Sequence, residues 1–189
     1  TGKSLAYLIP AIVSGRTTVV ATATKALQDQ LATKDLPFLQ EHLTPHLGRS
    51  FSFSVLKGRS NYVCRQRLVE LAAIGNDQQQ LDGVIDGLVK SADADELGVI
   101  VDWAEQTDTG DRSDLSKEPS PASWAAVSVG SNECPGATRC PSGDNCFAED
   151  ARATAAMSDV VVTNLHLYGI NLASEGAILP EHDLAILDE

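Results

Sequence analysis

Residues 1–10, TGKSLAYLIP, contain the pattern that decides the fold, because Gly-Lys-Ser stands directly before an apolar repeat with helical spacing. The phosphate-binding loop of nucleotide-binding proteins reads G-x-x-x-x-G-K-[ST], and this stretch matches its second half. In such a loop, backbone N–H groups at a helix N-terminus hold phosphates, the lysine reaches their outer oxygens and the hydroxyl binds Mg²⁺. By themselves, however, the same letters are better explained as a surface turn.

The pattern LAILDE at residues 184–189 supplies the partner that a phosphate-binding loop requires. In these proteins an acid at the C-terminal end of a neighbouring buried strand holds the same Mg²⁺. Asp188 is therefore predicted to hold Mg²⁺, largely through water, and Glu189 to orient and deprotonate an attacking water. Because both patterns occur together and in the right order, they predict a nucleotide site. Its predicted residues are Thr1, Gly2, Lys3, Ser4, Asp188 and Glu189, with catalytic roles for Lys3, Asp188 and Glu189.

Four short runs predict a parallel β-sheet. The runs TTVVATAT (17–24), SDVVVTN (158–164) and LAILDE (184–189) are compact and apolar, as buried parallel strands are. The run SFSFSVL (50–56) alternates apolar residues with serine, which is the period of a strand. The sheet is therefore expected to draw its strands from both ends of the sequence.

Helical spacing follows the predicted strands and the Gly-Lys-Ser pattern. Apolar residues recur with a helical period from Leu5 to Ile12, where Pro10 should kink or shorten the helix. A second helical stretch is predicted over residues 25–32. Because strands and helices alternate, the outer parts of the chain predict an α/β fold.

Residues 57–157 differ in character from the rest and predict an insertion. They hold all four cysteines, most of the acidic residues and several short helical patterns, with a polar stretch rich in Asp, Ser, Pro and Gly at 107–123. We therefore expect a first α/β part at 1–56, a mostly helical insertion at 57–157 and a return to the α/β part at 158–189.

The four cysteines predict a metal or cluster site at Cys64, Cys134, Cys140 and Cys146. A chain of 189 residues can bury a core without disulfides, and this one shows no signal for secretion. Structural zinc sites usually use C-x2-4-C pairs, whereas the last three cysteines here have two C-x5-C spacings. The looser spacing suits the four corners of a cubane cluster better, and zinc remains the alternative.

The surroundings of the cysteines favour thiolates. Cys64 precedes RQRLVELAA and Cys146 precedes FAEDARATAAM, so both sulfurs are predicted to lie at positive helix ends. Arg65, Arg67 and Arg139 add positive charge that would compensate an anionic cluster.

Charge is distributed unevenly along a chain whose formal net charge is −12. Residues 77–118 carry 12 acidic against three basic side chains, most simply a solvated face, whereas residues 49–67 carry five basic and no acidic ones. The stretch LKGRSNYVCRQRL (56–68) is predicted to contact a nucleic-acid backbone, with Tyr62 either stacking on an exposed base or packing beside the cysteine site. The predicted nucleic-acid-binding residues of this stretch are Lys57, Arg59, Tyr62 and Arg65.

The sequence shows no membrane or export signal. It has no run of 18 apolar residues, and its first residues lack a basic region followed by an apolar core and a cleavage site. We therefore expect a cytoplasmic protein that makes no membrane contact.

The order of these motifs resembles one family, the DinG-type iron-sulfur DNA helicases of superfamily 2, which are relatives of the XPD helicases. The segments similar to the family's motor are TGKSLAYLIPAI (1–12), VVATATKALQDQL (19–31), SDVVVTNLHL (158–167) and ILDE (186–189), the last resembling the start of a D-E-A-H box. The segments similar to its cluster domain are LKGRSNYVC (56–64) and CPGATRCPSGDNCFAEDAR (134–152). The cysteine spacing is closer to the DinG branch than to the XPD branch. Leu165 is a departure, because the family commonly has His directly after the position of Asn164.

The resemblance implies a RecA-like phosphate-loop motor domain interrupted by a [4Fe-4S] domain. The family's enzymes use ATP and Mg²⁺ to move 5′ to 3′ along single-stranded DNA and to separate duplexes, in DNA repair or replication. By this resemblance the four cysteines hold the cluster, and Thr22, Thr24 and Gln28 lie where the motor meets the DNA backbone. A monomeric motor acting on single-stranded or forked DNA in the bacterial cytosol is implied. Because such enzymes complete the ATP site with arginines from a second motor domain, we expect negligible ATP hydrolysis by these 189 residues alone.

Two alternatives stay open from the residues. A non-catalytic module that holds zinc or an iron-sulfur cluster would only bind nucleic acid or a protein partner. A nuclease of related ancestry is the other alternative, although the sequence shows no carboxylate cluster for its metal ions.

Overall fold

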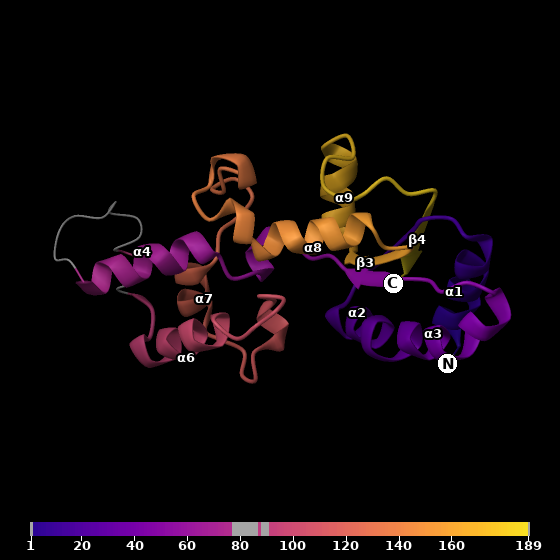
Figure 1. Cartoon of the computed structure of the whole chain (residues 1–189), viewed down its shortest axis with the longest axis horizontal. Helices are drawn as coiled ribbons and strands as arrows, with labels where there is room; N and C mark the ends of the chain where they lie inside the picture. Colours follow the sequence, from indigo (N-terminus) through magenta and orange to yellow (C-terminus); the bar gives the residue numbers. More distant parts are fainter. Residues whose placement is uncertain (1, 77–86, 88–90, 189) are drawn as a thin grey trace. The chain divides into compact units, whose positions relative to one another are not determined.

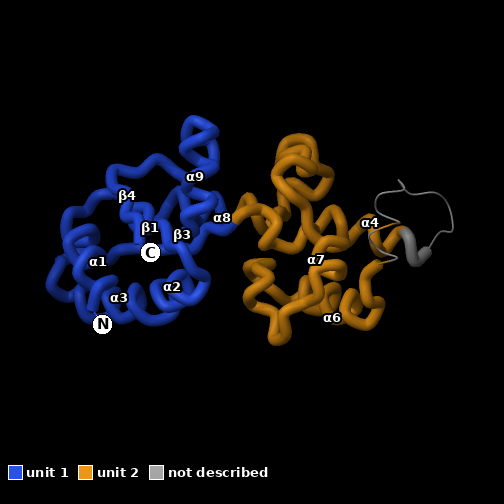
Figure 2. Tube along the Cα trace, turned by 180° about the vertical axis from the view of Figure 1, so that it is seen from behind, with its two compact units in different colours: residues 1–57, 151–189 blue, residues 58–150 orange. Residues whose placement is uncertain are grey.

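The computed structural model describes residues 2–76, 87 and 91–188, and the chain divides into two compact units. Unit 1 comprises Thr1–Lys57 and Ala151–Glu189, and unit 2 comprises Gly58–Asp150, as Figure 2 shows. Unit 2 is therefore inserted between two parts of unit 1.

Unit 1 is built on a four-stranded parallel sheet with the strand order β2-β3-β1-β4 (Figure 1). Its strands are β1 (Thr18–Thr22), β2 (Phe53–Val55), β3 (Val160–Asn164) and β4 (Leu184–Asp188). Each strand falls within one of the four predicted runs. Because β1 pairs with both β3 and β4, Thr22 stands beside Asp188 in the sheet, although the two are far apart in the sequence.

Alternate residues of the strands fill a separate core on each face of the sheet. The helical segments of unit 1 are α1 (Lys3–Ser14), α2 (Lys25–Gln30), a π-helical segment (Leu31–Asp35), α3 (Leu36–Leu47), the end of α8 (Phe147–Ala156) and α9 (Leu165–Ala173). Val20 belongs to one core with Leu8 and Leu36, whereas Val19 belongs to the other with Leu167. Figure 1 shows α2 and α3 on one side of the sheet and α8 and α9 on the other. Successive side chains of a strand point to opposite faces, so a continuous β-branched run serves both cores.

Helix α1 runs through Pro10 and is longer than the sequence predicted. It continues to Ser14 and ends at Gly15, whose left-handed backbone (φ 70°) closes the helix with a hydrogen bond to the Ile12 carbonyl. Proline removes the N–H that would bond the carbonyl of Ala6. Both Pro10 and Ala6 are exposed, so water can reach that carbonyl and the helix is not cut short.

The chain returns to unit 1 before the predicted position 158. Residues 151–156 of α8 already belong to unit 1, and Ala155 is fully buried in the same core as Val19 and Val161. The alanines of this helix allow a close approach to the sheet. The segment FAEDARATAAM contains several polar residues, so the sequence did not predict that its last turns pack on the sheet.

Unit 2 is mostly helical in its described part, as predicted. Its helices are α4 (Arg65–Asn76), α6 (Ala94–Ala104), α7 (Pro121–Val127) and the start of α8, with 3₁₀ turns at Arg59–Asn61, Arg112–Asp114, Ala137–Arg139 and Gly143–Asn145. Isolated antiparallel bridges join Tyr62 to Asp111 and Val63 to Ser128. Among the described residues, no helix is both long enough and apolar enough to cross a membrane.

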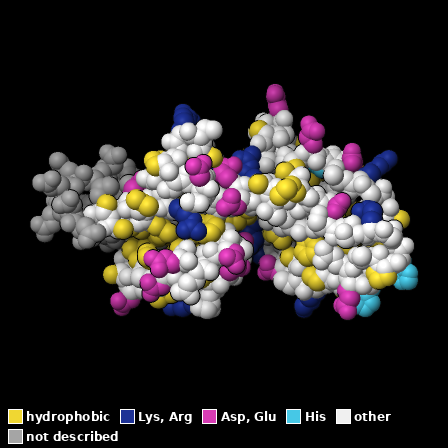
Figure 3. Space-filling model, in the orientation of Figure 1, with side chains coloured by type: hydrophobic (Ala, Val, Ile, Leu, Met, Phe, Trp, Pro, Cys, Tyr) yellow, Lys and Arg dark blue, Asp and Glu magenta, His cyan; other side chains and the backbone are white. Residues whose placement is uncertain are grey.

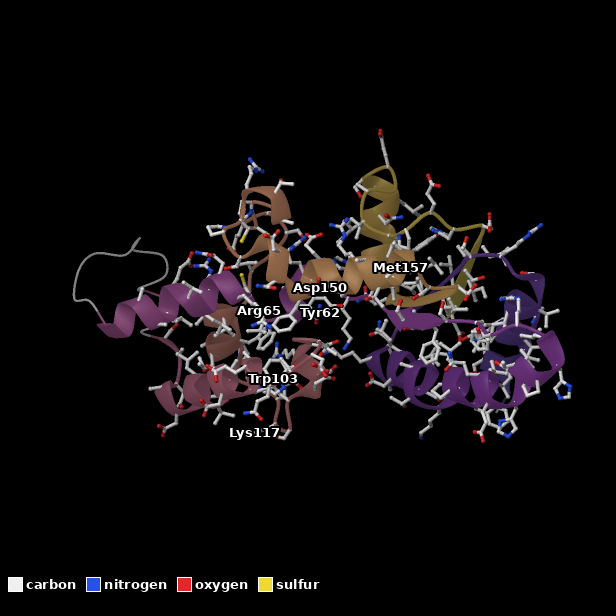
Figure 4. The ribbon with its side chains drawn as sticks, viewed as in Figure 1. Tyr62, Arg65, Trp103, Lys117, Asp150 and Met157 are labelled. Carbon is white, nitrogen blue, oxygen red and sulfur yellow. The ribbon has the colours of Figure 1, made fainter. Side chains whose placement is uncertain are left out.

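Trp124 anchors the interior of unit 2. It is 4% exposed, and its indole Nε1 donates a hydrogen bond of 2.7 Å to the carbonyl of Ser60. Its ring centroid lies 6.5 Å from that of Trp103, which Figure 4 labels on α6. The guanidinium of Arg112 lies 5.5 Å from the Trp124 ring centroid. The contact between Arg112 and Trp124 therefore attaches the polar segment that carries Arg112 to the two tryptophans.

Acidic side chains gather over α6 on the face that Figure 3 shows. Asp95 and Asp102 of this helix are both exposed, in agreement with the predicted solvated face. Residues 77–86 and 88–90 of the acidic stretch lie outside the described residues.

Candidate nucleotide and metal sites

The carboxylate of Asp188 joins the two ends of the described chain. It stands at the end of β4, and Asp188 is 4% exposed. Its Oδ1 forms an ion pair with Nζ of Lys3, and its Oδ2 accepts a hydrogen bond of 2.8 Å from the hydroxyl of Tyr7. The structure therefore brings together Lys3 and Asp188, which the sequence assigned to one nucleotide site.

Gly2 and Ser4 stand on either side of Lys3 at the N-terminus of α1. Gly2 precedes the first helical residue with a left-handed backbone (φ 77°), which glycine adopts without strain. The first N–H groups of any helix have no acceptor within it, so they can bind an anion. Ser4 is buried in the same turn. Thr1 and Glu189, predicted for this site, lie outside the described residues.

Tyr7 is a member of this site that sequence reasoning missed. Lys3 and Tyr7 are four residues apart on α1, so their side chains leave the same face of the helix. Burial, followed by the hydrogen bond to Asp188 and its negative charge, raises the pKa of Tyr7 above its ordinary value. The hydroxyl therefore stays protonated at neutral pH and remains a donor. The spacing K-x-x-x-Y next to a strand-end acid was the signal that could have found it.

Two of the three residues predicted to lie near DNA at the end of β1 are buried in unit 1. Thr22 is fully buried, and its hydroxyl donates to the carbonyls of Thr24 and Thr163. Gln28 is 4% exposed. Thr24 is exposed, and its hydroxyl accepts from the N–H of Leu27 as the cap of α2. The side chains of Thr22 and Gln28 are therefore buried in unit 1, and Thr24 is the exposed member of the three.

One cavity of unit 2 gathers the predicted metal ligands. The four cysteines that line it are Cys64, Cys134, Cys140 and Cys146. All four thiols are free of disulfides and partly exposed. The structure thus brings together residues that are up to 82 positions apart in the sequence, from Cys64 to Cys146.

The thiols share this cavity without forming a ready-made ion site. Within residues 2–76, 87 and 91–188, no group of three or more His, Cys, Asp or Glu side chains is placed to hold a metal ion. The thiols come from separate turns that line the same cavity. Cys64 precedes α4 and Cys146 precedes α8, as predicted.

Burial raises the pKa of the Cys64 thiol, even though this residue stands at a helix N-terminus. The N–H groups of Arg67 and Gln66 act in the opposite direction and stabilise the thiolate. The predicted helix-end effect is therefore present, but burial outweighs it. A coordinating metal deprotonates a thiol outright, which reverses this balance.

Two predicted nucleic-acid contacts are engaged within unit 2 instead. Arg59 is half-buried, donates to Sγ of Cys146 at 3.8 Å and forms an ion pair with Glu149. The guanidinium of Arg65 lies 4.2 Å from the ring centroid of Phe147. Both arginines therefore place positive charge beside the cysteine cavity.

Tyr62 packs in the interior of unit 2. It is 4% exposed and lines the cysteine cavity, and Figure 4 shows it close to Arg65. The packing alternative for Tyr62 therefore holds, and the stacking of an exposed base on its ring does not. Lys57, the remaining predicted contact, is partly exposed in unit 1.

Gly143 allows two turns that carry cysteines to touch. A Cβ placed on Gly143 would stand 2.0 Å from the carbonyl oxygen of Ala137, closer than atoms approach one another. The first turn leads into Cys140 and the second into Cys146. Glycine at this position therefore allows the turns that precede Cys140 and Cys146 to pack against each other.

A lysine at a helix N-terminus, paired with a strand-end carboxylate on a parallel sheet, is typical of phosphate-loop α/β proteins. Comparison with known proteins narrows this class. The chain is 43% identical over 195 residues to the ATP-dependent helicase DinG of Mycobacterium tuberculosis (strain ATCC 25618 / H37Rv). It is 37% identical over 196 residues to the ATP-dependent DNA helicase YoaA of Escherichia coli (strain K12), and 31% identical over 196 residues to the ATP-dependent DNA helicase DinG of Photobacterium profundum.

Each of these alignments covers 100% of the chain and 29%, 28% and 27% of the respective relative. The chain therefore spans less than a third of the length of these helicases. No protein-family model matches it. The matches agree with the resemblance that the motifs predicted, because the chain is similar over its whole length to DinG and YoaA helicases.

Proposed function

We propose that this chain is the nucleotide-binding and cluster-holding segment of an ATP-dependent DNA helicase. The enzyme moves 5′ to 3′ along single-stranded DNA and separates duplexes in DNA repair or replication. The observation that carries the proposal is the contact between Lys3 and Asp188, because it joins the two halves of an ATP site. The similarity to DinG and YoaA helicases supports it. Single-stranded or forked DNA is the proposed partner of a monomeric motor in the bacterial cytosol.

The residues around Asp188 fit ATP with Mg²⁺. The N-terminus of α1 and Lys3 provide positive charge for phosphates, while the Asp188 carboxylate and the Ser4 hydroxyl are oxygen ligands of the kind that Mg²⁺ prefers. Bound Mg²⁺ neutralises charge on the β- and γ-phosphates. The Lys3 side chain is 67% exposed, so it can turn from Asp188 toward the phosphates without opening the core. Glu189 is proposed to orient the attacking water and to accept its proton.

The cysteine cavity fits a [4Fe-4S] cluster. Four thiols line one cavity, and Arg59 adds an N–H donor to the sulfur of Cys146. Four cysteine ligands and hydrogen bonds to their sulfurs are what such clusters require, and the bound cluster supplies electron-transfer capacity. Zinc is the second candidate, because four cysteines also satisfy its structural sites. The two C-x5-C spacings favour the cluster.

Gly143→Ala is expected to weaken metal retention by about tenfold or more, the effect typical of residues that position metal ligands. The added Cβ must push the Ala137–Arg139 turn away, which separates Cys140 from Cys146. The measurement is the metal bound per chain as a function of chelator concentration.

Gly130→Ala is the matched control for this prediction, because a Cβ there meets nothing within 4 Å. It should retain metal as the unsubstituted protein does. Equal retention by the Gly143 and Gly130 variants would show that the two turns do not set the site.

The exposed N-terminus of α2 is the proposed contact of unit 1 with the DNA backbone. Thr24 is exposed there, and Lys25 follows as the first residue of the helix. Phosphates are commonly bound by hydroxyl groups and by helix N-termini. Of Thr22, Thr24 and Gln28, which the resemblance places near DNA, Thr24 is therefore the residue proposed to contact the backbone.

The test of the proposed function uses the full-length protein that carries this segment. We expect ATP-dependent separation of a duplex with a 5′ single-stranded tail, and none of a duplex with only a 3′ tail. The 189-residue chain by itself should hydrolyse negligible ATP. DNA binding without ATP-dependent strand separation on either substrate would favour the non-catalytic module, and cleavage of the strands would favour the nuclease.

A further inference from the structure

Lys3 and Tyr7 hold Asp188 from the same face of α1, one at each carboxylate oxygen. Nζ of Lys3 pairs with Oδ1, and the hydroxyl of Tyr7 donates to Oδ2 at 2.8 Å. The four-residue spacing makes this possible, because residues i and i+4 are neighbours on a helix surface. The two contacts differ in kind: the lysine is a mobile cation on an exposed stem, whereas the tyrosine is a rigid, half-buried ring.

The half-buried ring gives Tyr7 a fixed position. It packs against the core that contains Leu8 and Val20. The packed ring therefore holds the Tyr7 hydroxyl next to Asp188, on the same helix as Lys3. A carboxylate that is 4% exposed has few solvent partners, so this donor helps to fix how the carboxylate is turned.

We propose that Tyr7 is a positioning residue that holds Oδ2 of Asp188 so that Oδ1 faces the metal of the nucleotide site. This inference rests on the proposed ATP site. With nucleotide and Mg²⁺ bound, Lys3 would contact the phosphates, and Oδ1 of Asp188 would be the oxygen available to the metal. Tyr7 keeps its hydrogen bond to Oδ2 throughout, so the carboxylate does not rotate or offer both oxygens. Outer partners of metal ligands commonly act in this way.

The test is Tyr7→Phe in the full-length protein, which removes the hydroxyl and keeps the ring. Binding of a fluorescent, non-hydrolysable ATP analogue is measured as a function of Mg²⁺ concentration. We expect the Mg²⁺ concentration for half-maximal binding to rise about tenfold. Binding of the analogue in the presence of EDTA should stay unchanged, because Lys3 and the helix N-terminus remain.

Tyr168→Phe is the matched control. Tyr168 is also a half-buried tyrosine of unit 1, but it packs on the other face of the sheet, with its ring centroid 5.9 Å from that of His182. Its variant should have the Mg²⁺ dependence of the unsubstituted protein. The same measurement on Lys3→Ala should show weaker binding with and without Mg²⁺.

Three results would overturn the inference about Tyr7. An unchanged Mg²⁺ dependence in Tyr7→Phe, with normal binding by the unsubstituted protein, would refute Tyr7 alone. Equal losses with Mg²⁺ and with EDTA, accompanied by a lower Tm, would assign Tyr7 a purely structural role. Failure of the unsubstituted protein to bind the analogue at all would instead refute the proposed ATP site, and the inference with it.

Discussion

Lys3→Ala is expected to reduce DNA-stimulated ATP hydrolysis by the full-length protein by about 100-fold or more. The reason is that Lys3 is the cation that the structure places at the N-terminus of α1, opposite Asp188. Removing one group that stabilises developing charge typically has an effect of this size on the rate. The measurement is the steady-state rate of phosphate release at saturating ATP, Mg²⁺ and single-stranded DNA.

Lys34→Ala is the matched control for this loss. Lys34 is an exposed lysine of the π-helical segment Leu31–Asp35 in the same unit, so it tests the removal of one positive charge without touching Asp188. Its rate should equal that of the unsubstituted protein. Circular dichroism of Lys3→Ala should show an unchanged helix content. A Lys3→Ala protein that is folded and keeps its activity would contradict the assignment of the ATP site.

Replacement of any one cluster cysteine by serine is expected to remove most of the bound iron and the visible colour. The four variants are Cys64→Ser, Cys134→Ser, Cys140→Ser and Cys146→Ser. All four thiols line one cavity, and each would supply one corner of the cluster. A hydroxyl is a poor substitute for a thiolate, because it is harder and far less acidic. Iron per chain, after anaerobic purification, is the quantity to compare.

Ser131→Ala is the control for the serine variants. Ser131 is exposed and lies three residues before Cys134, so it tests a nearby substitution without touching a thiol. It should keep its full iron content. If one cysteine variant keeps full iron and colour while the other three lose both, that cysteine is not a ligand.

The framework of unit 1 could be predicted from the sequence because parallel strands leave a strong local signal. Runs such as TTVVATAT are β-branched on both faces, and they predicted buried strands that the structure contains. The meeting of Lys3 with Asp188 could be predicted for a related reason. The C-terminal ends of parallel strands lie at one edge of a sheet, where a phosphate-binding loop also ends.

The side-chain details could not be predicted, because they depend on packing between distant segments. Tyr62 is a polar aromatic beside basic residues, but it is buried. Thr22 and Gln28 occur in a motif expected at DNA, but the sheet and α2 cover them. Tyr7 received no predicted role, because its partner Asp188 comes from the other end of the sequence. The spacing of residues in the sequence indicates which face of a helix or strand a side chain occupies. It does not indicate which distant residue will contact that face.

The metal content of the unsubstituted protein, purified without oxygen, shows together with its visible spectrum what the four cysteines bind. We expect about four iron and about four sulfide ions per chain, and a broad visible absorption that reducing agents bleach. Such a result would place a cubane cluster within the chain that also carries Lys3 and Asp188. A colourless protein with one zinc ion per chain would contradict it, and would favour the zinc-binding module.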